Sequence, residues 1–423
     1  MRHKANLVGT IMNLRQSRIG AALAGLLLLE ACARIIPGPR PPVTPPPRPV
    51  PTTPVPPPKP VVTALDVGVH RGPDLAAFPL SDGAAQSALA SFRESCPKLM
   101  ARPDTSGLTQ RGDWQDVCAA ASGWPSSDAA RFFRSRFELA QVSDGATYVT
   151  GYYEPEIAGS RTRQPGYDVP VYGVPRDLVH ARPGDAPIKP NGQTPFGRYD
   201  ENGVFQPYFE RAEIDDGKLA GQGLEIAWAA DPVEFFFLQI QGSGRLRGPD
   251  GRVIRIGYAA DNGQNYTGIG TIMRQQGLLG NAPGQYPGSM QGIMQYIREH
   301  PQDGMSLMRQ NKSWVFFREL TGDGPIGAMG VPVRPHVSVA ADPLFTPLGA
   351  PVLIAADPAL ANANKVNGLW VAQDTGGAIK GPNRFDSFWG AGDEARRIAG
   401  GMLARGRAYI LLPKGTLARL GVR

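Results

Sequence analysis

Apolar residues recur at helical spacing in the first part of the folded chain and change to short continuous runs further on. Between residues 75 and 98, apolar positions such as Leu89 and Phe92 lie on one helical face after the polar Ser81, which predicts a capped helix. A second helix is predicted over 126–137, where two serines and an aspartate precede three phenylalanines. The folded part of the chain is therefore expected to begin with amphipathic helices.

From residue 146 onward, the apolar runs are short and are separated by glycine and proline. We expect strands at 146–153, 169–174, 224–241, 253–258, 314–317, 337–339, 352–354, 369–372 and 408–412. Helices are expected to interrupt them at 265–278, at 289–311 with a break at Pro301, and at 393–404. Many short strands with such turns favour a mainly β fold built on a barrel rather than a doubly wound sheet.

The first 31 residues have the pattern of an export signal. Basic residues such as Arg2 and Arg18 precede an apolar run at 19–29, which is too short to span a bilayer as a helix. The run ends just before Cys32, and this junction resembles a bacterial lipoprotein cleavage site with Cys32 as the lipidated residue. Glu30 departs from the small or apolar residue usual there, so a plain signal peptide or an uncleaved anchor are the alternatives.

Residues 32–62 read as a linker, because prolines recur through most of this segment. Such a chain lacks the backbone donors for helix or sheet and adopts extended polyproline II structure. At ~3.1 Å per residue, residues 33–59 would reach on the order of 80 Å. A tether of that length would hold a folded domain away from a membrane, and a spacer without any role in reach is the alternative.

Charge and metal-binding residue types limit the function classes. The formal net charge is +7, and removal of the first 31 residues leaves +4, which suits an anionic polymer without requiring one. No basic run with interleaved aromatic residues occurs, so nucleic acid is not an expected partner. The five histidines are scattered, which gives little support to a catalytic zinc or a Ser-His-Asp triad.

The only cysteines after Cys32 are Cys96 and Cys118. In an exported chain, an even pair is compatible with one disulfide that closes a short loop. Two buried free thiols are the alternative.

Two carboxylates, Asp374 and Asp386, lie on either side of a glycine-rich turn. A strand-like run at 368–372 leads to Asp374, and a second short run ends at Asp386. Glycine tolerates positive φ and close approach to a ligand, and two acids beside a glycine-lined cleft fit the chemistry of a glycosidic bond. The alternative is that both are solvated turn residues, since Asp beside Gly is ordinary turn composition.

The export signal, the sequence Thr-Gly-Tyr-Tyr-Glu-Pro at 150–155 and the acidic stretch together resemble the membrane-bound lytic murein transglycosylase A family. The C-terminal part is similar to the three-aspartate (3D) domain, and its acids match Asp342, Asp374 and Asp386. Further matches lie at 239–244, 311–317 and 390–395. The resemblance covers about 147–413, which is most of the folded chain.

This resemblance implies a double-psi β-barrel domain with helices, interrupted by a smaller inserted β-rich domain. The barrel domain would comprise 63–155 and 312–423, with the 3D domain at about 330–415 and the insertion at 156–311. The glycan strand would bind in a groove between the two domains. A lipid anchor would place the protein on the periplasmic side of the outer membrane, or in the periplasm without lipidation. No cofactor, metal or nucleic acid is implied.

The resemblance also implies a lytic exotransglycosylase. Such an enzyme cleaves the β-1,4 bond between N-acetylmuramic acid and N-acetylglucosamine without water, leaving a 1,6-anhydro end. By the family's pattern, Asp386 is the single acid and base, and an apolar wall from Phe385, Phe388 or Trp389 would keep it protonated. Asp374 would be the second acid or, alternatively, a cap on the amides of the 376–377 turn.

The remaining candidates follow from matched positions and from chemistry. Asp342 is expected to serve mainly as a turn or barrel-closing residue. Thr150 is a candidate hydrogen-bond partner of substrate or of Asp386, or an ordinary strand residue. The candidates for substrate contacts, each with a structural or surface role as the alternative, are Tyr152, Tyr153, Gln239, Gln241, Ser243, Lys380 and Arg384.

Two other functions fit the same residues. A muramidase that uses Asp374 and Asp386 would hydrolyse the same bond and add water to the new end. A non-catalytic barrel that binds the wall as a scaffold is the second alternative, and it would release no soluble products.

Overall fold

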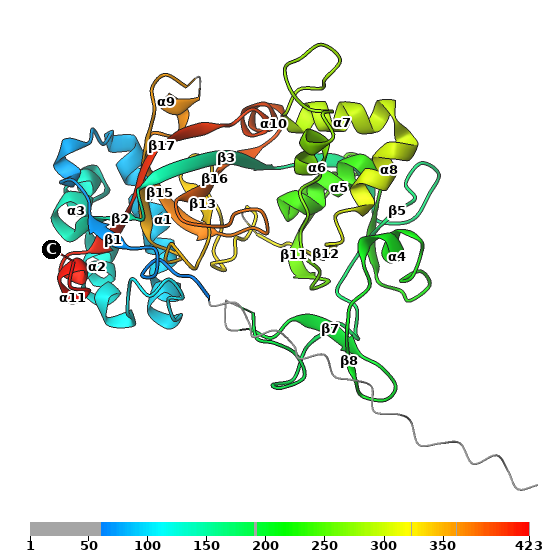
Figure 1. Cartoon of the computed structure of the whole chain (residues 1–423), viewed down its shortest axis with the longest axis horizontal. Coiled ribbons are helices and arrows are strands. Elements are labelled where there is room, and N and C mark those ends of the chain that lie inside the picture. Colours follow the sequence, from blue (N-terminus) through cyan, green and yellow to red (C-terminus); the bar gives the residue numbers. More distant parts are fainter. Residues whose placement is uncertain (1–60, 190–192, 323, 361, 423) are drawn as a thin grey trace, which may run out of the picture. The chain divides into compact units, whose positions relative to one another are not determined.

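The computed structural model describes residues 61–422 except 190–192, 323 and 361 (Figure 1). The predicted export signal, the lipidation site at Cys32 and nearly all of the proline-rich linker lie outside these residues. The described residues belong to one compact unit. Within the described part, no helix is long and apolar enough to cross a membrane.

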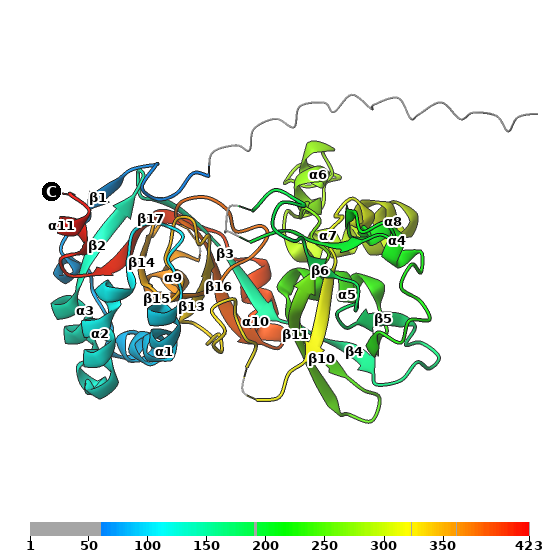
Figure 2. The same ribbon diagram turned by 90° about the horizontal axis from the view of Figure 1, so that it is seen from below.

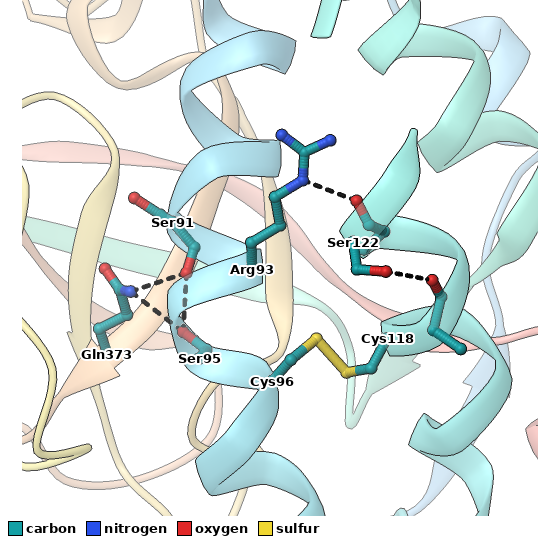
Figure 3. Close-up of a disulfide and its surroundings, with 9 residues drawn as sticks. Ser91, Arg93, Ser95, Cys96, Cys118, Ser122 and Gln373 are labelled. Carbon is teal, nitrogen blue, oxygen red and sulfur yellow. Dashed lines mark hydrogen bonds between the residues drawn. A yellow bond between two sulfur atoms is a disulfide. The ribbon is translucent and has the colours of Figure 1, made fainter. Parts of the chain in front are cut away.

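Three α-helices lie in the N-terminal part of the described residues. They are α1 (Asp82–Ala101), α2 (Arg111–Gly123) and α3 (Ala129–Arg136). The Ser81 side chain accepts a hydrogen bond from the backbone of Ala84 at the start of α1, as the sequence predicts. A disulfide joins Cys96 on α1 to Cys118 on α2 (Figure 3). The apolar faces of these helices share one buried cluster, so the disulfide reinforces a packed unit.

Eight strands form the larger sheet, and six of them close on themselves. Following the hydrogen-bonded order, the sheet runs β1-β2-β17-β14-β15-β13-β16-β3, and β3 also pairs with β17. The ring therefore consists of β3, β16, β13, β15, β14 and β17 (Figure 2). The bounds of these eight strands are β1 Val69–Arg71, β2 Phe137–Val142, β3 Ala146–Glu154, β13 Ser338–Ala341, β14 Pro351–Ala356, β15 Gly368–Asp374, β16 Arg384–Ala391 and β17 Ala404–Pro413.

Buried apolar residues from the strands of this ring, such as Val149, Val339 and Phe385, form a second core cluster. Helix α10 (Asp393–Gly400) packs on the ring through Ala395 and Ala399, and α9 (Ala363–Val366) and α11 (Thr416–Arg419) are short. Two neighbouring pairs in the ring are parallel, β13 with β15 and β16 with β3. These pairs bring sequence-distant segments side by side.

Residues between β3 and β13 form two further sheets. One has the order β12-β11-β10-β4-β9-β5, and the other has the order β6-β7-β8. The bounds are β4 Glu156–Ser160, β5 Val169–Tyr172, β6 Val179–His180, β7 Phe196–Tyr199, β8 Phe205–Pro207, β9 Glu225–Ala229, β10 Ser243–Arg247, β11 Val253–Asp261 and β12 Val315–Glu319. The helices of this segment are α4 Arg211–Asp215, α5 Pro232–Gln241, α6 Ile269–Gln275, α7 Met290–Glu299 and α8 Pro301–Arg309.

The strand predicted over 224–241 is wrong beyond residue 229. Helix α5 begins after Asp231, whose side chain accepts hydrogen bonds from the backbone of Val233 and Glu234. Pro232 occupies the first turn, where its missing N–H costs nothing. Gly242 ends the helix with a φ of 75°. These caps select a helix for a run that is too uniformly apolar to show a helical period.

The expectation of a mainly β fold is only partly confirmed. Strands account for about 29% of the residues, so the fold combines substantial β-sheet with many helices. Helix α2 adds to the helical part and was not predicted. The predicted helix over 289–311 is confirmed as two helices that meet at Pro301.

Candidate active site

Asp374 and Asp386 lie in one row across four strands of the closed sheet. On β13, Ala340 is the register partner of both Asp374 on β15 and Asp386 on β16. On the next strand, Thr150 is the partner of Asp386. Residues in register share a face of a sheet, and neighbouring strands lie about 4.8 Å apart. The ladder therefore gathers both acids and Thr150, although 236 residues separate Thr150 from Asp386.

Asp386 lies third in β16, so the expected run that ends at this residue instead continues beyond it. The Thr150 hydroxyl donates to Asp386 Oδ1 at 2.5 Å, and Arg384 Nη2 donates to the Thr150 oxygen at 2.8 Å. Burial raises the pKa of Asp386 to about 6, with a smaller contribution from Asp374, against the opposing effects of Thr150 and Arg384. A carboxyl with this pKa keeps its proton in mildly acidic solution, which is the property that a general acid requires.

Of the three aromatic residues expected to form an apolar wall at Asp386, one lies on the same face of β16 as the acid. Phe388 is two residues further along the strand and packs on Tyr152 with 5.0 Å between ring centroids. These rings form a buried cluster with Ala340 and two other apolar side chains. Phe385 and Trp389 belong to the other core, inside the ring. Strand alternation accounts for this division.

Asp374 accepts three hydrogen bonds. Its Oδ2 accepts from the Tyr152 hydroxyl at 3.0 Å, and its Oδ1 accepts from the backbone of Ala328 at 2.8 Å and of Thr375 at 2.9 Å. Of the two alternatives for Asp374, the cap is found on the amides of Ala328 and Thr375 instead of those of the 376–377 turn. Burial raises the pKa of Asp374, and these hydrogen bonds oppose that effect.

Gln373, the residue before Asp374, connects strand β15 to helix α1 through hydrogen bonds. Gln373 donates to the Ser91 carbonyl and to the Ser95 hydroxyl, both at 3.0 Å (Figure 3). Its side-chain oxygen accepts from the Ser338 hydroxyl. All of these groups are buried. Since Ser91 and Ser95 lie on α1, next to the disulfide, the position of Asp374 depends on a rigid support outside the ring.

The third acid, Asp342, is 4% exposed and orders the chain. Its Oδ2 accepts from the backbone of Gly381 at 2.8 Å, and its Oδ1 accepts from Leu344 at 3.2 Å. Gly381 lies in the connection between the other two acids. Asp342 thus acts as the turn residue that the sequence predicts.

Several predicted substrate contacts are occupied within the protein. Both tyrosine rings, Tyr152 and Tyr153, are buried, and the Tyr153 backbone donates to Gln241 Oε1 at 3.0 Å. Gln239 is 2% exposed and binds Arg211 and the Val315 carbonyl. Gln239 is therefore an interior residue rather than an exposed partner for an acetamido group.

Other predicted positions remain accessible. Ser243 is partly exposed at the start of β10, and Lys380 is exposed in the turn between the acids. Arg384 is partly exposed and lies over the Tyr148 ring at 4.9 Å. Burial lowers the pKa of Arg384, and Asp386 opposes this effect.

Sequence reasoning missed Tyr266, because the pattern assigned it to a helix over 265–278. The structure begins that helix at Ile269 and leaves Tyr266 in the preceding loop, against Gly377. The local Asn-Gly and Thr-Gly pairs are the turn signal that would have separated this loop from the helix. Within the described part of the chain, no cluster of histidine, cysteine or acidic residues has the makings of a metal site.

Comparisons with known proteins fit this arrangement. The MltA specific insert domain matches residues 148–318, and the 3D domain matches residues 337–412. A membrane-bound lytic murein transglycosylase from Agrobacterium tumefaciens is 31% identical, with 83% of this chain and 99% of that chain covered and a TM-score of 0.72. Membrane-bound lytic murein transglycosylase A of Escherichia coli K12 is 29% identical over 80% of this chain and 84% of its own length.

A structure of E. coli MltA with bound chitohexaose is 27% identical, covers 82% of this chain and 94% of its own, and has a TM-score of 0.57. The fold and the matched regions define a 3D-domain protein with an MltA-type insert. The chain belongs to the membrane-bound lytic murein transglycosylase A family.

Proposed function

We propose that this chain is a lytic transglycosylase of peptidoglycan. It cleaves the β-1,4 bond between N-acetylmuramic acid and N-acetylglucosamine and leaves a 1,6-anhydromuramyl end. Membership of the family supports this activity, as do the names of the similar enzymes. The chitohexaose bound to a related protein supports a linear amino-sugar polymer as the substrate class. The observation that carries the proposal is the placement of Asp386 between Thr150 and an apolar cluster, opposite the same residue as Asp374.

Asp386 performs both proton transfers in this mechanism. The protonated carboxyl gives its proton to the glycosidic oxygen while the bond from that oxygen to muramyl C1 breaks. The muramyl C6 hydroxyl then attacks C1, and its proton returns to the Asp386 carboxylate. No water is consumed, so one residue suffices as acid and base. The Thr150 hydrogen bond fixes the carboxyl, and the burial that raises its pKa supplies the resting proton.

Asp374 stabilises the positive charge that develops at C1. Its carboxylate is held by two backbone amides and Tyr152, so little reorganisation accompanies the reaction. The same negative charge disfavours ionisation of Asp386. Two carboxyl groups in different environments thereby adopt different protonation states, which is the condition for acid catalysis beside an ionised neighbour.

The finer assignments are parts of the same proposal. The closed ring of six strands is taken as a double-psi barrel, comprising 63–155 and 312–423, with the insert at 156–311. Arg384 and Lys380 are proposed to meet carboxylates of the muramyl lactyl or peptide groups, and Ser243 and Gln241 to line the groove. A lipid at Cys32 is proposed to anchor the protein to the outer membrane, facing the periplasm.

The test is a mass-spectrometric profile of soluble products from purified peptidoglycan. The chain from Val61 is compared with its Asp386→Asn variant. Products lighter by one water than reducing muropeptides, and their absence with the variant, are expected. Reducing ends that carry label from heavy-oxygen water would instead indicate a muramidase. Wall binding by both proteins without products would indicate a scaffold.

A further inference from the structure

Tyr266, from the segment inserted between β3 and β13, lies against the turn that follows Asp374. A Cβ atom placed on Gly377 would lie 3.1 Å from Tyr266 Cβ and 3.4 Å from its Cγ. The two residues are therefore in direct contact, and the missing side chain at Gly377 leaves room for the tyrosine. This contact connects the inserted segment to the loop between the two acids.

A buried polar network fixes the loop that carries Tyr266. At one end, Asn262 is fully buried, donates to the carbonyls of Phe209 and Lys312, and accepts from the backbone of Trp314. At the other end, Asn311 Oδ1 accepts from the backbone of Thr267 at 3.1 Å. These hydrogen bonds hold both sides of the loop, so the tyrosine is presented at a defined position.

Arg211 and Gln239, which take no part in the proposed mechanism, complete this network. Arg211 is 3% exposed and donates to the Asn311 carbonyl at 2.9 Å and to Gln239 Oε1 at 2.6 Å. Gln239 and Asn311 both belong to segments that the sequence analysis singled out. Their interior position gives them a role in supporting the loop of Tyr266.

The phenol of Tyr266 lies within electrostatic reach of Asp386. Burial raises the pKa of Tyr266, the Asp386 carboxylate raises it further, and Arg211 opposes both. Asp386 interacts electrostatically with Arg384 on its own strand, Tyr152 on β3, Asp374 on β15 and Tyr266 from the inserted segment, and its hydrogen-bond partner is Thr150 on β3. Of these, Tyr266 is contributed from outside the ring.

We propose that Tyr266 is a positioning residue of the active site, whose ring covers the turn that follows Asp374 and keeps water from the Asp386 carboxyl. The proposal rests on the proposed function, since it assigns the inserted segment a part in keeping the acid protonated. The ring acts through its volume and through its contact with Gly377. The hydroxyl is not required for this role, which separates it from a hydrogen-bonding one.

The test compares Tyr266→Ala and Tyr266→Phe in the full chain. Tyr258→Ala is the matched control, because Tyr258 belongs to the same inserted segment, is 44% exposed and binds Asp261. The Asp386 carboxyl is titrated by carbon-13 NMR, and product release is followed against pH. In the alanine variant, the pKa of Asp386 is expected to fall by about one unit as water enters. The rate above pH ~6 then falls about tenfold, while the phenylalanine variant and the control keep the wild-type titration.

A second variant, Gly377→Ala, protects the test against a variant that does not fold. The added methyl would lie 3.1 Å from Tyr266 Cβ and would push the tyrosine away by a few tenths of an ångström, so a smaller shift of the titration in the same direction as for Tyr266→Ala is expected. An unchanged titration in a folded Tyr266→Ala protein would overturn the proposal, as would a phenylalanine variant that behaves like the alanine variant. The NMR titration decides this even if wild-type protein releases no anhydro products, an outcome that concerns only the proposed function.

Discussion

Asp374 and Asp386 face the same residue, Ala340, from the two strands that flank β13. The two acids are therefore two strand spacings apart, about 10 Å between backbones. At this separation each carboxyl has its own hydrogen-bond partners, three donors for Asp374 and Thr150 for Asp386. One sheet thus supplies two acids of different character.

Replacement of the acid is the first prediction. Asp386→Asn keeps the shape of the side chain and removes the transferable proton, so the rate of anhydromuropeptide release is expected to fall by about 10²–10⁴-fold. Release is quantified by chromatography and mass spectrometry. Circular dichroism of the variant serves as the control for folding. A folded variant that retains more than a tenth of the activity would remove Asp386 from the proton-transfer role.

Asp386→Asn is also expected to change how the free energy of unfolding depends on pH. Burial raises the pKa of Asp386 to about 6 in the folded protein, from 3.8 as its ordinary value. Between pH ~4 and pH ~6, the unfolded chain loses the proton of Asp386 while the folded chain keeps it. The contribution of this residue to the free energy of unfolding is therefore fully present below pH ~4 and is lost as the pH rises through ~6. Relative to wild type, Asp386→Asn should therefore gain on the order of 1–2 kcal/mol between pH 4 and pH 7. Urea unfolding at both pH values measures the difference, and a constant difference would contradict the raised pKa.

Replacement of Thr150 is expected to raise the pKa of Asp386, whereas replacement of Tyr266 by alanine is expected to lower it. The Thr150 hydroxyl lowers the pKa of Asp386 by hydrogen bonding, so Thr150→Val should move the decline of activity above pH ~6 to higher pH. The maximal rate should fall about tenfold, because the carboxyl loses its orientation. Thr150→Ser restores the hydroxyl and is expected to restore both quantities. Rate profiles from pH 4 to pH 8 at constant ionic strength test this, and a valine variant with the wild-type profile would refute it.

Much of this site follows from the sequence, whereas its geometry does not. The pairing of Asp374 with Asp386 and the hydrogen bond from Thr150 match residues that the motifs identify. No local pattern predicts that Ala340 aligns the two acids, because register across four strands depends on closure of the ring. The loop of Tyr266 carries a local turn signal, but nothing local predicts the contact of this tyrosine with Gly377, which is more than a hundred residues away.

The role of Asp374 is tested by separating its charge from its hydrogen bonds. Asp374→Asn removes the charge and retains a carbonyl oxygen for the amides of Ala328 and Thr375, and Tyr152→Phe removes one hydrogen bond and retains the charge. Steady-state rates should fall about tenfold or more for the first and less than about threefold for the second. The Asp386 titration should move to lower pH in the asparagine variant alone. Equal losses in both variants would assign Asp374 a structural role.

The disulfide carries a prediction about stability. Cys96 and Cys118 are separated by 22 positions, and closure of a loop of this length contributes about 3 kcal/mol by the chain-entropy model. The double Cys96→Ser and Cys118→Ser variant should lose about this much free energy of unfolding in urea. Reductant should have the same effect on wild type and none on the variant. An unchanged wild-type midpoint in reductant would show that the bridge adds nothing.

Among the elements, the errors of sequence reasoning have identifiable causes. Helix α5 buries phenylalanines on two sides, so its apolar run resembles a strand, and only Asp231, Pro232 and Gly242 mark it as a helix. In α2, by contrast, Trp114 and Val117 occur at helical spacing, so the apolar pattern of this segment does indicate a helix. The break at Pro301 was predictable because proline acts locally.

The ring closes where β17, at the end of the chain, pairs with β3 through residues 404–407 and 146–149. This pairing joins segments more than 250 positions apart, and contacts of such long range form slowly. An incomplete chain therefore has no ring to hold Asp386 against Thr150. The arrangement of Asp386 and Thr150 thus depends on β17, a strand that carries neither residue.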